Sequence, residues 1–135
     1  MELEEIIKNC NCICLYLDGE KTYFEKNSPA YNDIMNAWED MTNNAIQMPA
    51  FGVSINAMTV ENMRKGLWFE MLFNSKQQDE GMPFVRLLVN VVNDFSGFNI
   101  IRYLPEEGYQ GRCFYFQLMG CDMSEFAKAL NKAIK

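Results

Sequence analysis

The sequence contains no histidine. Histidine is the commonest general base, the commonest transition-metal ligand and the side chain that titrates nearest neutral pH. The chain also lacks a G-x-S-x-G motif and a glycine-rich phosphate loop of the G-x-G-x-x-G or Walker A type. A serine nucleophile would therefore have no histidine to activate it. From these absences we predict no catalytic residues and no cofactor, and we regard a non-enzymatic role as the better hypothesis.

Basic residues are scarce relative to acidic ones. Twelve Lys and Arg residues stand against eighteen Asp and Glu residues, for a net charge of −6. Binding to phosphate backbones or to anionic membrane surfaces depends on clustered Lys and Arg, so nucleic acid and membrane are not expected partners. No apolar stretch approaches the roughly 18 residues of a membrane span. The acidic N-terminal segment MELEEIIKNC does not resemble a secretory signal, and we expect a cytoplasmic protein.

The chain has five cysteines, and three of them are crowded together at Cys10, Cys12 and Cys14. An odd number of cysteines without an export signal indicates free thiols in a reducing compartment. A spacing of two predicts that the three side chains share one strand face. A zinc site would need a second pair, which only Cys113 and Cys121 could supply, and these are not in a suitable turn. We therefore predict buried structural cysteines and no metal, with Cys10 as the most exposed thiol.

The order of apolar patterns and turn signals predicts one hairpin-then-helix unit three times along the chain. The turn Asp18-Gly19 and the helix start Ser28-Pro29 are the strongest local signals. Leu67–Phe73 alternates between two faces as a strand does. The predicted hairpins and their helices are Cys12–Glu25 with Pro29–Met48, Phe51–Phe73 with Pro83–Asp94, and Phe98–Leu118 with Met123–Lys135.

Two parts of the second unit are harder to interpret. Asn56–Gly66 interrupts the hairpin and fits either a short helical turn or an irregular connection. The strand at Phe51–Ile55 could consequently pair elsewhere or at a dimer edge. Asn74–Gly81 is polar and predicts a loop. The segment that follows, Pro83–Asp94, is apolar nearly all round and predicts the most buried helix.

At 135 residues the chain is predicted to form one α+β domain spanning residues 1–135. The expected architecture has two layers, with an antiparallel sheet of about six strands and three main helices mostly on one face.

A small set of residues is the best candidate for a ligand site. Arg102 and Arg112 flank the last turn and could grip a carboxylate or phosphate with paired guanidinium groups. Tyr103 and Tyr115 could add stacking surface. Glu70 is the only acid inside an apolar strand, LWFEMLF, where burial could shift its pKa. The alternative for the arginines is solvated ion pairing with nearby glutamates.

Two functions from different classes follow. The first is a non-enzymatic protein-interaction or regulatory module, with a protein partner or a second copy of the chain. Acidic charge and an abundance of methionine and aromatic residues favour it. The second is a domain or enzyme that binds a small anionic ligand in a pocket between sheet and helices, near Arg102 and Arg112.

Overall fold

The computed structural model describes residues 2–49 and 52–135. Its main feature is a seven-stranded antiparallel sheet with the strand order β2-β1-β5-β6-β7-β9-β3, and a separate two-stranded sheet joins β4 to β8. The helices are α1 (Glu2–Ile7), α2 (Pro29–Thr42), α3 (Asn56–Asn62) and α4 (Ser124–Ile134). The strands are β1 (Cys12–Leu17), β2 (Glu20–Glu25), β3 (Ile46–Met48), β4 (Val53–Ser54), β5 (Leu67–Asp79), β6 (Met82–Val91), β7 (Gly97–Tyr103), β8 (Gly111–Arg112) and β9 (Phe114–Gln117).

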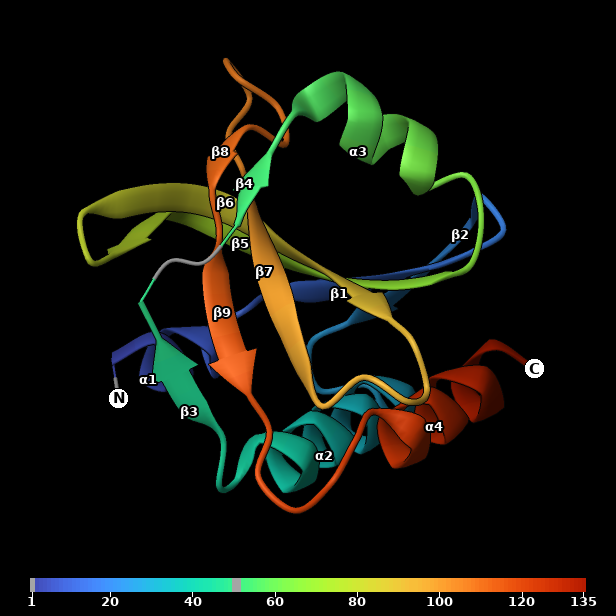
Figure 1. Ribbon diagram of the computed structural model, residues 1–135. Coiled ribbons are helices and arrows are strands. Elements are labelled where there is room, and N and C mark those ends of the chain that lie inside the picture. The colour runs from blue at the N-terminus through green and yellow to red at the C-terminus, as the bar shows by residue number, and fades with distance from the viewer. Residues whose placement is uncertain (1, 50–51) are drawn as a thin grey trace.

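This arrangement confirms the predicted α+β fold with a large antiparallel sheet. Figure 1 shows α1, α2 and α4 on one side of the sheet and α3 on the other side. The sheet therefore buries two apolar faces of unequal size. The large core lies under α1, α2 and α4, and a small cluster lies under α3.

Trp38 is the centre of the large core. It is 2% exposed, and its ring lies 5.3 Å from that of Phe69 and 5.6 Å from that of Phe126. The rings of Phe98 and Phe116 lie 5.7 Å and 6.3 Å away. Tilted and edge-to-face contacts of this kind add to the stabilisation from apolar burial. One side chain of α2 thus joins α4 to strands β5, β7 and β9.

Several local predictions are confirmed. The first hairpin turns at Asp18 and Gly19, whose φ angles of 50° and 87° are the positive values that a tight two-residue hairpin needs. The hydroxyl of Ser28 accepts a hydrogen bond from the amide of Tyr31 and so caps α2. Alternation along Leu67–Phe73 is also as predicted, since the odd-numbered residues enter the large core.

The predicted helix at Pro83–Asp94 is wrong, because this segment forms strand β6 at the centre of the sheet. A strand that is covered on both faces is apolar nearly all round, as a buried helix is, so periodicity alone does not separate the two. The polar loop predicted at Asn74–Gly81 is also largely strand. It forms the end of β5, and the chain turns at Glu80 and Gly81, which both have positive φ angles.

The second predicted hairpin–helix unit is therefore a pair of long adjacent strands, β5 and β6. Strand β4 pairs with β8 rather than with β5, which is the alternative that the sequence left open. Phe51, where that strand was expected to begin, lies outside the described residues. Asn56–Asn62 forms the short helix α3. The predicted helix Pro29–Met48 ends at Thr42, and its last residues form the edge strand β3.

The crowded cysteines do not share one face, contrary to the prediction. Cys10 precedes β1 and lies in the large core, where its sulfur contacts the hydroxyl of Tyr31 at 3.0 Å. Cys14 lies on the opposite side of the sheet, in the cluster under α3. Cys10 is fully buried, so its predicted exposure is also wrong.

Replacing Trp38 by Ala is expected to lower the free energy of unfolding by about 3–5 kcal/mol, because it removes the ring that joins α2, α4 and the sheet. Urea denaturation followed by circular dichroism measures this change. Met119→Ala is the control: Met119 is 51% exposed, and its loss is expected to cost less than about 0.5 kcal/mol. Equal losses in the two variants would contradict this account of the core.

Candidate functional site

Glu70 lies on β5 on the side of the sheet that faces α3, and it has no exposure to solvent. Its Oε1 atom accepts a hydrogen bond of 2.7 Å from the hydroxyl of Tyr16, and its Oε2 atom accepts one of 2.6 Å from the hydroxyl of Tyr109. Hydrogen bonds to a carboxylate are stronger than those between neutral groups. The carboxylate is therefore held in one orientation by donors from β1 and from the loop before β8.

These two tyrosines line a pocket of about 650 Å³ between the sheet and α3. Its charged lining comes from β2, β6, the segment following α3 and the loop between β7 and β8. Its apolar lining includes Val60 and Met63. The charged residues that line it are Lys21, Arg64, Arg86, Glu106 and Glu107.

Hydrogen bonds at both ends of α3 fix this helix over the pocket. The side-chain oxygen of Asn56, at the start of the helix, accepts from the amide of Tyr109 at 2.8 Å. Beyond its end, the indole nitrogen of Trp68 donates to the carbonyl of Lys65 at 2.9 Å. Gly108 has a φ of 77°, and a Cβ atom there would overlap the side chain of Asn56. The close approach of loop and helix therefore depends on glycine at this position.

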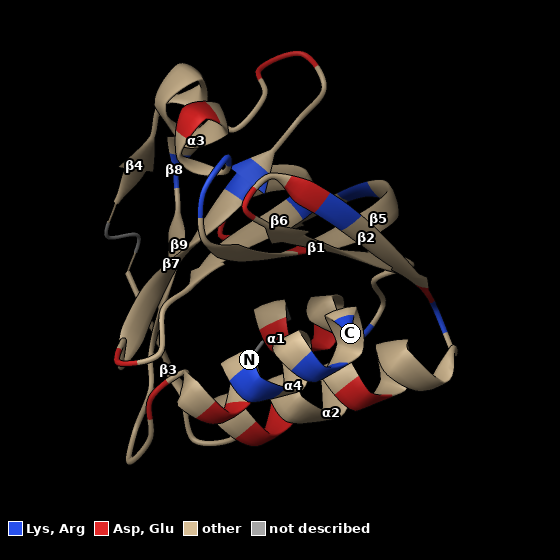
Figure 2. Cartoon of the chain, turned by 90° about the vertical axis from the view of Figure 1, so that its right-hand side faces the viewer, with Lys and Arg blue, Asp and Glu red and all other residues tan. Residues whose placement is uncertain are grey.

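Two basic side chains of the pocket lie over aromatic rings. The guanidinium carbon of Arg86 is 4.4 Å from the ring centre of Tyr103, and the ammonium nitrogen of Lys21 is 5.8 Å from that of Tyr16. Both distances are within the range of cation–π attraction. Figure 2 shows basic positions on the strands beneath α3 and acidic positions along α2. Stacking restricts the motion of these two side chains before a ligand binds. Binding therefore costs less of their conformational entropy.

Burial raises the pKa of Glu70, and the hydrogen bonds from Tyr109 and Tyr16 together with the charge of Arg86 oppose that rise. The pKa values of Tyr16 and Tyr109 are raised by burial and by the negative charge of Glu70. Burial lowers the pKa of Arg86, but the charge of Glu70 and a hydrogen bond with Tyr109 outweigh that effect, and the net shift is upward. Arg86, Tyr109 and Glu70 thus form one chain from cation to carboxylate.

The structure brings together two of the five residues predicted for a ligand site. Tyr103 lines the pocket, and Glu70 lies behind the tyrosines that line it. Arg102 and Arg112 do not line it. The guanidinium group of Arg102 instead donates to the carbonyls of Arg112 at 2.7 Å and of Pro83 at 2.8 Å, while the side chain of Arg112 is exposed. Arg102 therefore ties β7 to β6 and β8.

Tyr115, the fifth predicted residue, lies away from the pocket on β9. Its hydroxyl is packed against Gly97 and donates to the side-chain oxygen of Gln117 at 3.4 Å. Tyr103 is the one predicted site residue that lines the pocket, and its neighbours there, among them Tyr16, Lys21 and Arg86, were not predicted. The register explains why Arg86 was missed. It pairs with Leu72, two residues from Glu70 on the same face of β5, and this proximity exists only if Pro83–Val91 is a strand.

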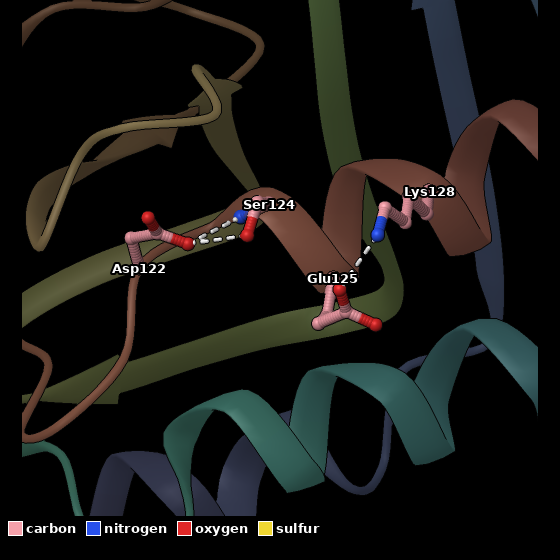
Figure 3. Close-up of polar contacts among 4 residues, drawn as sticks. All are labelled: Asp122, Ser124, Glu125 and Lys128. Atoms are coloured by element: carbon pink, nitrogen blue, oxygen red, sulfur yellow. Dashed lines mark hydrogen bonds and ion pairs between the residues drawn. The ribbon is translucent and has the colours of Figure 1, made fainter.

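A second hollow, of about 810 Å³, lies where α2, α4 and the loop before β7 meet. Its walls carry Asp40, Asp94, Asp122 and Glu125, of which two are already engaged. Figure 3 shows the carboxylate of Asp122 accepting hydrogen bonds from the amide and hydroxyl of Ser124, and Glu125 paired with Lys128 at 2.9 Å. In the described part of the chain, no three His, Cys, Asp or Glu residues are placed to hold a metal ion.

A scan against protein-family models finds no match, and searches of the curated proteins and of the solved structures find none either. Among the described residues, no helix is both long and apolar enough to cross a membrane. The site is therefore interpreted from its own geometry.

Because the pKa of Glu70 is raised in the folded state, the folded protein holds this proton more tightly than the unfolded chain does. The contribution of Glu70 to stability should fall as pH rises from 4.5, its ordinary value, through its folded pKa. Glu70→Gln removes this titration. Urea denaturation at a series of pH values measures the free energy of unfolding of both proteins. We expect the value for the native protein minus the value for the variant to decrease over this range. Glu20→Gln, which removes an exposed carboxylate on β2, is the control, and parallel curves for native protein and Glu70→Gln would contradict the prediction.

Proposed function

We propose that the pocket beneath α3 binds a small organic molecule with an apolar or aromatic body and an anionic group. One observation carries this proposal: a fully buried carboxylate is linked through Tyr109 to Arg86, and both of these residues line a pocket. A buried charge is costly even when it is paired, so it is weak evidence for a purely structural role. Charged networks beside pockets are, in contrast, typical of functional sites.

The dimensions and lining of the pocket support this class of ligand. A volume of about 650 Å³ lies within the range of roughly 300–1,000 Å³ that small-molecule sites occupy. The rings of Tyr16, Tyr103 and Tyr109 with Val60 and Met63 offer contact area to an apolar body.

The sign of the charge on the ligand follows from which groups are available. Glu70 is not available to a ligand, because both of its oxygens already accept hydrogen bonds from tyrosines. Lys21 and Arg86 line the pocket on the strands, and their stacked positions leave donors for a carboxylate or a phosphate. Glu106 and Glu107, from the loop between β7 and β8, also line the pocket, so its charged lining comprises three cations and two carboxylates.

Benzoate and phenyl phosphate test the proposal as probes, with neutral benzyl alcohol for comparison. We expect both anions to shift the amide resonances of residues that line the pocket, and the alcohol to shift them much less. Arg86→Met should weaken binding of the anions at least about tenfold, which corresponds to about 1.4 kcal/mol. Two-dimensional NMR titration of the full chain measures both effects.

Two further variants make the result interpretable. Arg112→Met removes an arginine that is exposed outside the pocket and should leave binding unchanged. Lys21→Met removes an exposed cation of the pocket and should weaken binding even if Arg86→Met fails to fold. Equal binding of benzyl alcohol, or equal losses in Arg86→Met and Arg112→Met, would contradict the proposal.

Protein interaction is a second candidate function, and a separate observation favours it. Large apolar side chains of β3, β4 and α3 are exposed near one another in the sequence, among them Val53 at 70%, Met58 at 61% and Ile55 at 52%. Exposed apolar clusters are typical of interaction surfaces. A cytoplasmic location remains part of this proposal, supported by the five cysteines, all of which are free thiols in the structure.

A further inference from the structure

The chain contains one long segment without charge. None of the twenty residues between Asp40 and Glu61 is charged, although 22% of the chain is Asp, Glu, Lys or Arg. At that frequency a segment of this length would carry about four charges. The described part of this segment contains β3, β4 and most of α3.

Six large apolar side chains of this segment are exposed. Val60 lines the pocket beneath α3, and we refer to the other five as the apolar strip. They are Ile46 at 48%, Met48 at 40%, Val53 at 70%, Ile55 at 52% and Met58 at 61%. The strip therefore combines exposed apolar surface with an absence of charge. Soluble proteins usually interrupt such a surface with charged side chains, and lysine in particular is common on exposed sheet edges.

The strip also follows open sheet edges. Strand β3 is the last strand of the seven-stranded sheet, and β4 pairs with β8 alone. Figure 1 shows β3 and β4 one after the other along the same border of the molecule, beside β9 and β8. An edge strand presents backbone donors and acceptors that can pair with another strand.

We propose that the apolar strip is the contact surface for a second copy of this chain. The inference rests on the second candidate function, protein interaction. Each copy carries a net charge of −6, so most face-to-face contacts between copies would bring like charges together. The strip lies in the longest uncharged segment of the chain, so this repulsion is small there. A basic partner would instead be attracted to the acidic surface and would find no opposite charge on the strip.

The symmetry and size of the strip define the kind of dimer. Two strand edges related by a two-fold axis run antiparallel, and the backbone donors of each edge face the acceptors of the other. The contact therefore closes as a dimer. A standard interface uses roughly 20–30 residues on each side. Only part of the described uncharged segment is exposed, so the strip falls well short of this number, and we expect a weak dimer that depends on concentration.

Sedimentation velocity of the full chain between about 1 μM and about 500 μM tests the proposal. We expect the native protein to shift from monomer to dimer over this range. Val53 lies near the middle of the strip in sequence, so a charge there is brought close to its own copy. Val53→Lys and Val53→Glu should each weaken the dimer at least tenfold, and an equimolar mixture of the two should restore dimers. Met119→Lys, which places a charge on another exposed apolar residue outside the strip, should behave as the native protein does.

A photo-crosslinking residue in place of Met58 distinguishes failure of the dimer proposal from failure of the protein-interaction function. A monomer at every concentration overturns the second-copy inference. If that monomer is crosslinked through Met58 to one different protein in extracts of its own source, protein interaction stands without the dimer, and if it is not crosslinked, both fail. A dimer that Met119→Lys weakens as much as Val53→Lys, or one that the mixture does not restore, overturns the location on the strip.

Discussion

Glu70 lies at the centre of the sheet, on a strand between β1 and β6, and its carboxylate has no exposure to solvent. Such a group is tolerated only when donors satisfy its oxygens. Tyr16 and Tyr109 supply them, one to each oxygen. Tyr109 can reach the carboxylate because its loop is held against α3 by Asn56, while Ser54 in β4 donates to the carbonyl of Tyr109. The position of α3 and β4 is thus linked to one buried charge.

The two sides of the sheet have different physical roles. On the side of α2 and α4, stability comes from close aromatic packing around Trp38, with neighbouring ring centres about 5–6 Å away. On the side of α3, the buried cluster is small and is mixed with hydroxyl and carboxylate groups. A short helix fixed at its ends by hydrogen bonds covers a smaller area than the helix pair opposite. The side of α3 therefore has room for a pocket, and the large core supplies the rigid support beneath it.

Predictions from the sequence succeeded where one local rule decides the outcome. Asp18-Gly19 requires positive φ angles, Ser28-Pro29 provides a cap, and successive side chains of Leu67–Phe73 alternate between two faces. They failed where tertiary contacts decide. Pro83–Val91 is apolar as a helix or as a central strand, and only its pairing with β5 selects the strand. The same error concealed the site: Glu70 was noted as an unusual acid, but Arg86 was assigned to a helix, so the two opposite charges were not placed on one face.

The binding role that we propose accounts for the Glu70 network more fully than a role in stability does. Tyrosine hydroxyls that hold a carboxylate recover part of its lost hydration, and an apolar side chain of similar volume would need no such compensation. A purely structural role would also not require that the same chain of groups continue to the wall of a pocket, as it does from Glu70 through Tyr109 to Arg86. Arginine is protonated in any case, and the charge of Glu70 further favours the charged form of Arg86 by raising its pKa against the effect of burial. A fixed, charged and partly buried arginine over an aromatic ring is a suitable arrangement for recognising a planar anion.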